Sequence, residues 1–328
     1  MDPTLKNMTD RHYSQYDMDA AKILDAFLPD RLFDAHVHLS HIDLQDRSKT
    51  SIQEYLEEMK PLIGSRELKG NYIIHPLTPL KAPKIREEST HYLKEQLTLH
   101  PGNAGEMIVL PDDSEEEIEK QLIHPCIKGL KCYHIFANRT DTFYSGIEEY
   151  LPESAWEVAN ARGLCITLHM VRPAALADND NRNYIKTMAK RYPNAKLILA
   201  HAARSFAAWT AIDCVEELVP YENVFFDFAA VCESPAMIQI LKKVGAKRCM
   251  FGTDWTCSMA AGKCISIGDT FYWLNEKDLR AFTSKTDLHT WLVGTETLMA
   301  QRQACILTDL KEREIEDLFY NTAASLFL

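Results

Sequence analysis

Two histidines that stand one residue apart are the first candidates for chemistry in this sequence. His36 and His38 end a short apolar run, "RLFDAHVH", over residues 31–38. On a strand, side chains at positions i and i+2 point the same way, so the two imidazoles share one face. Neutral imidazoles arranged in this way are good ligands for zinc or a similar metal. The pair alone is better explained by two hydrogen-bonded histidines inside a sheet, so other residues must decide.

Four further polar residues stand at the ends of β-rich runs later in the chain: Lys131, His169, His201 and Asp254. In a parallel barrel, the catalytic side chains gather at the carboxyl ends of the strands, and each strand–helix unit takes roughly 31 residues. The intervals from His38 through these residues fit whole numbers of such units. This agreement favours a shared metal site over isolated histidines that are satisfied by hydrogen bonds.

The elements that would position these residues form a regular alternation of β-rich runs and amphipathic stretches. Such an alternation indicates parallel strands with helical crossovers, and eight units indicate a closed (β/α)₈ TIM barrel of the α/β class. An open doubly wound sheet is the alternative, but no Gly-rich nucleotide-binding loop follows any run. The runs cover residues 31–38, 70–76, 106–111, 127–135, 163–170, 195–202, 223–231 and 248–255.

The remaining segments predict additions to a single barrel domain over residues 31–328. Residues 1–30 are expected to form an N-terminal helical extension, because "DMDAAKILDAFL" is periodic. Residues 256–287 follow the eighth run and predict an active-site loop or lid. The final stretch, "DLKEREIEDLFYNTAASLFL", is typical of one or two closing helices.

The composition narrows the class of partner. The chain has 328 residues with 36 basic and 47 acidic side chains, a formal net charge of −11, which argues against binding nucleic acid or an anionic membrane. No stretch reaches 18 apolar residues and no signal peptide is evident, so a cytoplasmic protein is expected. The nine cysteines include no C-x-x-C pair. They are interpreted as reduced, mostly buried residues and not as a zinc site.

Lys131 needs an interpretation of its own, since a lysine inside a barrel is costly unless it is paired or chemically altered. Reaction with carbon dioxide would turn it into a carbamate that bridges two metal ions. As an ammonium it would bind a substrate carboxylate or form an ion pair with Asp254. The sequence leaves these alternatives open.

Five segments in order, "FDAHVHL", "GLKCY", "ITLHM", "LILAHAARS" and "MFGTDWT", together resemble the amidohydrolase superfamily. With the closing "IEDLFYNTAASLF", the chain is similar to the amidohydrolase-related (amidohydrolase 2) group of metal-dependent hydrolases and decarboxylases, over about residues 31–328. The resemblance implies a distorted (β/α)₈ barrel. It also implies a divalent metal, Zn²⁺ in one or two copies, with Mn²⁺ as the alternative.

The same resemblance suggests a role for each residue. His36 and His38 would bind the first metal, with Asp254 as a further ligand. His169 and His201 would bind a second metal or, in one-metal members, divide ligation and substrate polarisation between them. "GLKCY" resembles the strand-four lysine motif of two-metal members, so Lys131 would be carboxylated if two ions bind.

Substrate-binding residues are expected just beyond these ligands. Arg172 and Arg204 follow His169 and His201 by three residues each, and either could hold a carboxylate through two hydrogen bonds. Tyr133 shares a face with Lys131 and could donate to an oxyanion, and His75 ends the second strand. Surface or packing roles are the alternatives for all four. Asp227, in "VFFDFAA", is expected to face inward, but its partner is not evident.

The function predicted from these features is that of a metal-dependent hydrolase. It would activate water on a divalent cation, with Asp254 and His201 as catalytic residues, to cleave an amide, lactone or ester bond of a small, carboxylated substrate. One alternative is a nonhydrolytic decarboxylase, hydratase or isomerase of the same family. Another, of a different class, is a metal-free binding or scaffold barrel. A homo-oligomer, in the form of a dimer, is expected.

Overall fold

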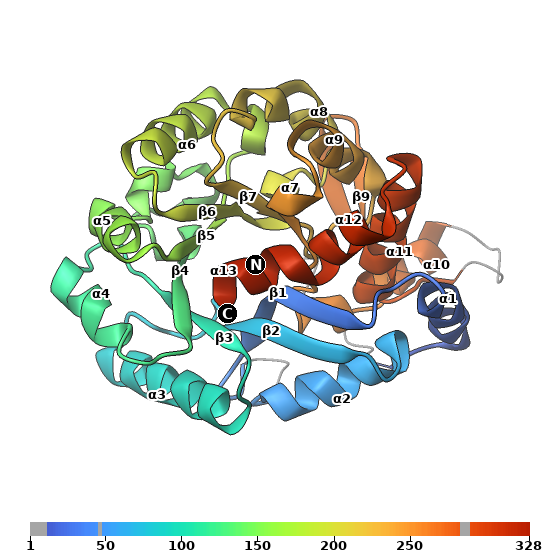
Figure 1. The fold of residues 1–328 in the computed structure, drawn as a ribbon, viewed down its shortest axis with the longest axis horizontal. Coiled ribbons are helices and arrows are strands. Elements are labelled where there is room, and N and C mark those ends of the chain that lie inside the picture. The colour runs from blue at the N-terminus through green and yellow to red at the C-terminus, as the bar shows by residue number, and fades with distance from the viewer. Residues whose placement is uncertain (1–11, 45–47, 283–288) are drawn as a thin grey trace.

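Eight parallel strands form one sheet whose spatial order follows the chain, from β1 through β8 (Figure 1). The computed structural model describes residues 12–44, 48–282 and 289–328. All eight β-rich runs of the sequence are confirmed as strands. Their bounds are β1 Arg31–Leu39, β2 Glu67–Ile74, β3 Ala104–Ile108, β4 Ile127–Tyr133, β5 Cys165–His169, β6 Lys196–Leu199, β7 Val224–Asp227 and β8 Cys249–Met250.

Backbone hydrogen bonds close the sheet into a barrel. The amide of Ala35 donates to the carbonyl of Phe251 at 2.9 Å, that of Asp254 to His36 at 2.9 Å, and that of His38 to Trp255 at 2.8 Å. These bonds join the segment that follows β8 to β1. An open doubly wound sheet would leave this edge unpaired, so the (β/α)₈ barrel is confirmed.

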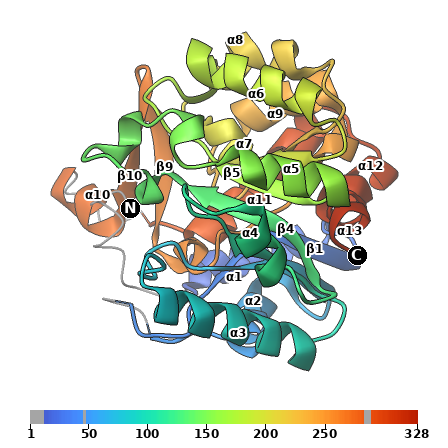
Figure 2. The same cartoon turned by 90° about the vertical axis from the view of Figure 1, so that its left-hand side faces the viewer.

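Helices surround the barrel (Figures 1 and 2). In α2, for example, Ser51 caps the first turn by accepting from the amide of Glu54, and Tyr55, Met59 and Leu62 are buried. The helices are α1 Gln15–Asp25, α2 Ile52–Ile63, α3 Pro83–Leu99, α4 Glu115–Gln121, α5 Glu153–Arg162, α6 Asn179–Arg191, α7 Ala200–Arg204, α8 Trp209–Cys214, α9 Ser234–Val244, α10 Glu276–Phe282, α11 Val293–Leu307, α12 Glu312–Glu316 and α13 Thr322–Phe327.

An apolar cluster fills the amino-terminal end of the barrel. α13 lies across this end in Figure 1, and the ring of Phe327 stacks on that of Phe33 with centroids 5.9 Å apart. Inward-facing side chains near the strand starts complete the cluster, among them Ala104, Cys165 and Met250. The polar side chains of the barrel are therefore concentrated toward its carboxyl end, where the site lies.

The segment after β8 is more ordered than the loop that the sequence predicted. Within residues 256–287, β9 (Gly262–Ile267) and β10 (Thr270–Asn275) form an antiparallel hairpin, and α10 follows it. The rest of the predicted segment, residues 283–288, lies outside the described residues, as do residues 1–11 of the N-terminal extension. The described part of that extension contains α1, which begins with a capping box at Ser14.

The cysteines and the helices match two expectations from composition. All nine thiols are unpaired, and eight of them are buried. In the part of the chain that the structure describes, no helix combines the length and apolar character needed to cross a bilayer.

Candidate metal centre and substrate pocket

His36, His38 and Asp254 converge at the carboxyl end of the barrel. Nε2 of His38 lies 3.2 Å from Nε2 of His36 and 3.0 Å from Oδ1 of Asp254, and the third side of the triangle is 3.8 Å. Ligands bound tetrahedrally to zinc at about 2.0–2.1 Å lie roughly 3.3 Å from one another. The two nitrogens and one oxygen therefore have the spacing and the chemistry of a metal site, as the sequence predicted.

The electrostatics keep these groups in the forms that bind metal. Burial, reinforced by the charge of Lys131, lowers the pKa of His36 to about 3, and burial also lowers the pKa of His38. For Asp254, burial acts to raise the pKa, but hydrogen bonding by His38 and the nearby His201 and His36 hold it well below its usual range. At neutral pH the cluster therefore offers two neutral imidazoles and a carboxylate.

Asp227, at the end of β7, supports this cluster from behind. Its Oδ2 lies 3.1 Å from Nδ1 of His36, and its Oδ1 accepts hydrogen bonds from the backbone amides of His201, at 2.9 Å, and Ala229, at 3.1 Å. Ligand atoms of His36, His201 and Asp227 also lie within 4.8 Å of one another. The sequence indicated that Asp227 faces inward but did not reveal these partners.

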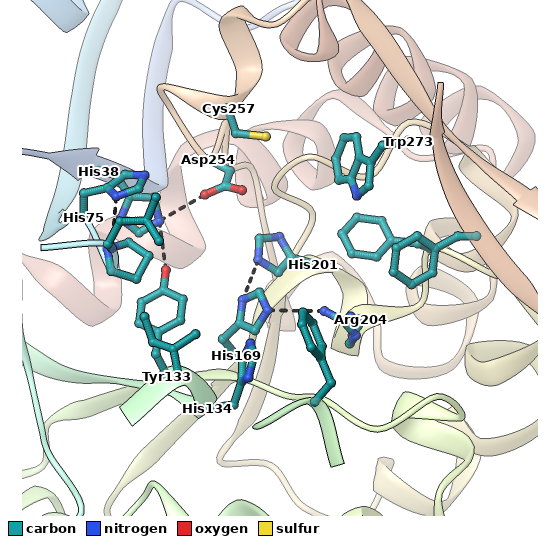
Figure 3. A pocket seen from close by; sticks show the side chains of 16 residues that line it. His38, His75, Tyr133, His134, His169, His201, Arg204, Asp254, Cys257 and Trp273 are labelled. Atoms are coloured by element: carbon teal, nitrogen blue, oxygen red, sulfur yellow. Dashed lines mark hydrogen bonds and ion pairs between the residues drawn. The ribbon is translucent and has the colours of Figure 1, made fainter. Parts of the chain in front are cut away.

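His169 and His201 form a second group beside this cluster (Figure 3). Nδ1 of His201 lies 2.9 Å from the carbonyl oxygen of Ala229, so this nitrogen is the donor. Nε2 of His201 then accepts from Nδ1 of His169 at 3.2 Å, and Nε2 of His169 accepts from Nη1 of Arg204 at 3.3 Å. Both ring nitrogens of His169 thus face these neighbours and not the His36–His38–Asp254 cluster, whereas the ring of His201 has its centroid 5.1 Å from that of His36.

The backbone around His201 is unusual and sets the direction of two side chains. Residues His201, Ala202, Ala203 and Arg204 have φ angles of 57°, 53°, 58° and 56°, so α7 is in fact a left-handed turn. Asp254 also has a positive φ of 58°. Each such residue costs about 1–3 kcal/mol, and strain of this kind persists where the surroundings enforce it. Here the strained residues include two of the predicted catalytic side chains.

Lys131 is fully buried beneath the cluster. Its Nζ lies 3.1 Å from Nε2 of His36 and 4.9 Å from the centre of the Tyr133 ring. Burial lowers the pKa of Lys131, while Asp227, Glu106 and Asp254 oppose this effect. Lys131 makes no ion pair within 4 Å of a carboxylate of the described residues. Lys131 is therefore in contact with a residue of the cluster, and its role as a carbamate or an ammonium stays a prediction.

Two buried carboxylates near the cluster were missed by the sequence analysis. Glu106 on β3 accepts from Thr167 at 2.9 Å, in space that a side chain at Gly129 would fill. Asp34 accepts from the amides of His36 and Thr253 at 2.9 and 3.0 Å and thereby joins β1 to the loop after β8. In each case the residue lies inside a β-rich run, and only the contacts across strands reveal its role.

A cavity of about 120 Å³ opens beside the metal-binding cluster, and most of its wall is apolar (Figure 3). Aromatic rings dominate one side, where the rings of Phe271 and Trp273 on β10 lie 4.8 and 5.6 Å from that of Phe206. The lining residues are His38, His75, Pro76, Leu77, Tyr133, His134, Ile135, Phe143, His169, His201, Arg204, Phe206, Asp254, Cys257, Phe271 and Trp273.

Three of the four predicted substrate-binding residues line this cavity. The hydroxyl of Tyr133 lies 3.0 Å from Nε2 of His38, and Nδ1 of His75 accepts from the amide of Leu77 at 3.2 Å. The guanidinium of Arg204 lies beside Phe271, 5.3 Å from the ring centre. Arg172 is not among the lining residues, because it forms ion pairs with Asp178 and Asp180 at 3.0 and 2.6 Å.

His134 also lines the cavity but was not predicted as a site residue. β4 ends at Tyr133, and a short 3₁₀ turn beginning at His134 replaces the alternation of the strand. Its Nδ1 lies 3.1 Å from the carbonyl oxygen of Thr142, so that nitrogen carries the proton. The direction of the His134 side chain depends on the residue at which β4 ends, and the sequence does not locate that end to one residue.

Comparisons with solved structures find the same fold in other proteins. A zinc-bound amidohydrolase from Burkholderia multivorans has 13% identity and a TM-score of 0.60, with 90% of this chain and 99% of that chain covered. A putative 2-pyrone-4,6-dicarboxylic acid hydrolase from Pseudomonas putida has 14% identity and a TM-score of 0.55, with coverages of 92% and 98%. A dihydroxybenzoic acid decarboxylase from Polaromonas sp. JS666, with bound manganese and the inhibitor 2-nitroresorcinol, has 14% identity and a TM-score of 0.55, with coverages of 90% and 96%.

At these identities the solved structures show a shared fold. No curated protein matches the sequence. The family model described as "Amidohydrolase" matches residues 33–328, which include all of the barrel but the first two residues of β1, and every residue of the metal-binding cluster. The chain therefore belongs to the amidohydrolase family.

Proposed function

We propose that this protein is a metal-dependent hydrolase that cleaves an amide, lactone or ester bond in a small carboxylated molecule. The observation that carries the proposal is the triangle of His36, His38 and Asp254, whose ligand atoms lie 3.0 to 3.8 Å apart beside the cavity. The cavity volume of about 120 Å³ suits a small molecule, and Arg204 is among the lining residues.

The ion that best suits two imidazole nitrogens and one carboxylate oxygen is Zn²⁺, with Mn²⁺ as the alternative. The Burkholderia relative binds zinc and the Polaromonas relative binds manganese. When bound, such an ion acts as a Lewis acid and lowers the pKa of a coordinated water toward neutrality. A single ion fits the cluster, and carboxylation of Lys131 belongs only to a form with two ions.

The side chains of the cavity supply the remaining steps. Asp254 has a carboxylate at neutral pH, so it can accept the proton of an attacking water and pass it to the leaving group. Tyr133 can donate a hydrogen bond to an oxyanion. Nδ1 of His201 donates to the carbonyl of Ala229 and its Nε2 accepts from His169, so in this arrangement His201 has no N–H to offer to the scissile carbonyl. Arg204 can hold the carboxylate of the substrate through two hydrogen bonds.

Decarboxylation of an aromatic acid is the second candidate reaction. The observation that favours it is the aromatic wall of Phe206, Phe271 and Trp273, which suits a flat ring. The related Polaromonas enzyme is a dihydroxybenzoic acid decarboxylase. Release of carbon dioxide on turnover would identify decarboxylation. Formation of a new carboxylic acid without carbon dioxide would identify hydrolysis.

The test begins with elemental analysis of protein purified without added metal, followed by activity assays on carboxylated lactones, amides and aromatic acids. We expect close to one zinc or manganese ion per chain. Asp254→Asn should keep the fold but reduce kcat by at least about 10²- to 10⁴-fold, since it removes a proton acceptor and a ligand. A folded variant with normal turnover would refute this mechanism, and a chain that binds no ion would favour the scaffold alternative.

A further inference from the structure

Asp227 is a buried carboxylate that contacts two parts of the site at once. It lies at the end of β7 and is fully buried. One oxygen faces Nδ1 of His36 at 3.1 Å. The other accepts from the backbone amides of His201 and Ala229 at 2.9 and 3.1 Å. It is not among the residues that line the cavity.

The contact with His36 fixes the tautomer of that ring. A carboxylate can only accept, so Nδ1 of His36 must carry the proton and donate it to Oδ2 of Asp227. Nε2 is then left with its lone pair, and it points toward Nε2 of His38 and Oδ1 of Asp254. A metal-binding imidazole whose other nitrogen donates to a carboxylate is held in orientation and made a stronger ligand.

The contact with His201 fixes the strained turn. His201 has a φ of 57° and begins four consecutive left-handed residues, which would not persist without support. The amides of His201 and Ala229 both donate to the same oxygen of Asp227, and Nδ1 of His201 donates to the carbonyl of Ala229 at 2.9 Å. One carboxylate therefore connects the metal ligand His36 to the wall that contains His201 and Arg204.

We propose that Asp227 is the positioning residue of the metal centre, which holds His36 in its metal-binding tautomer and fixes the turn of His201 relative to it. Asp227 acts through these two histidines and does not touch the substrate. The inference rests on the metal site of the proposed function.

Asp227→Asn provides a sharp test because the side chain keeps its size. If the amide oxygen stays on the backbone amides, the amide nitrogen faces His36 and can only donate. The proton of His36 must then move to Nε2, where it blocks the metal. If the amide is reversed, its nitrogen faces two backbone donors. Either orientation should weaken metal binding by about 10- to 100-fold.

The readout is the dissociation constant for Zn²⁺, measured by competition with a chromophoric chelator. The absorption spectrum of the Co²⁺-loaded protein should change as well, since the ligand geometry changes. Asp17→Asn is the matched control: Asp17 is also buried and accepts from a backbone amide, that of Leu292 at 2.9 Å, but it lies in α1. We expect its Zn²⁺ affinity to stay within about twofold of the wild type, as for any substitution outside the centre.

A measurement on the wild type covers the case in which Asp227→Asn does not fold. Nitrogen-15 NMR of the histidine rings, with His36 assigned by its loss in His36→Gln, should show the proton on Nδ1. An Nε2 proton on His36, or an Asp227→Asn affinity equal to that of the wild type, would overturn the role of Asp227 and leave the proposed function standing. A wild type that binds no divalent ion would overturn both.

Discussion

The direction of the side chain decides whether an arginine lines the cavity: Arg204 does and Arg172 does not. Arg204 and Arg172 each follow a cavity histidine by three residues, so the sequence could not distinguish them. The left-handed turn directs Arg204 to Nε2 of His169, whereas Arg172 is paired with Asp178 and Asp180 at the start of α6. Turn conformation and ion-pair partners depend on contacts that spacing does not encode. The ligands His36 and His38 were predictable because alternation along a strand depends on local geometry alone.

Exchanging each arginine for methionine tests this distinction. Arg204→Met should raise KM for a carboxylated substrate by roughly 10- to 100-fold, because a hydrogen bond to a charged group is worth about 1.5–3 kcal/mol. Arg172→Met is the matched control, and its KM should equal that of the wild type. Steady-state kinetics on both variants give the answer. An unchanged KM in Arg204→Met would remove the carboxylate-binding role.

Among the elements, the hairpin of β9 and β10 shows what the sequence contained and what was overlooked. Gly268 and Asp269 form a two-residue connection between the paired residues Ile267 and Thr270, and Gly268 has a φ of 61°. A Gly-Asp pair between alternating residues is a hairpin signal. It was present in the segment that we predicted as a loop. That β10 contributes to the cavity wall could not be predicted, since it depends on packing against Phe206.

Alternation along β10 makes a prediction for two adjacent residues. Trp273 is 5% exposed and lines the cavity, whereas its neighbour Tyr272 points outward and is 37% exposed. Trp273→Ala should lower kcat/KM roughly tenfold or more, since about 1.4 kcal/mol of apolar contact with the substrate suffices for that loss. Tyr272→Ala should leave kcat/KM close to the wild type. Equal effects of the two variants would show that the hairpin does not form the wall that the substrate contacts.

At the scale of the whole molecule, the interior of the barrel is apolar at one end and contains ionisable side chains toward the other. Its amino-terminal end is filled by apolar side chains such as Phe33, Met250 and Phe327. Toward the other end, the buried charged residues Glu106, Lys131 and Asp227 lie inside the same cylinder. The closed barrel and the order of its ligands were predictable, because strand–helix alternation determines where the strands end. The inward carboxylates were harder to predict, since a strand buried on both faces lacks clear polar alternation.

The raised pKa of the buried Glu106 should be measurable as a pH dependence of the free energy of unfolding. Burial outweighs the opposing effect of Lys131 and raises the pKa of Glu106 from 4.5 to about 7. A carboxyl group whose pKa is raised on folding binds its proton more tightly in the folded state. Its stabilising contribution is therefore complete below about pH 4.5, and it is lost as the pH rises toward 7. The loss is at most about 3.5 kcal/mol, since a difference of one in pKa is worth about 1.4 kcal/mol.

Glu106→Gln removes this titration while keeping the size of the side chain. Urea unfolding with a chelator present, between pH 4.5 and pH 8, should show the variant gaining free energy of unfolding relative to the wild type as the pH rises. The gain should be concentrated below pH 7, because Glu106 in the wild type is ionised above that value. Glu157→Gln, on the exposed side of α5, should show no such gain. Parallel curves for wild type and Glu106→Gln would mean that Glu106 is ionised inside the barrel throughout, with Lys131 compensating its charge fully.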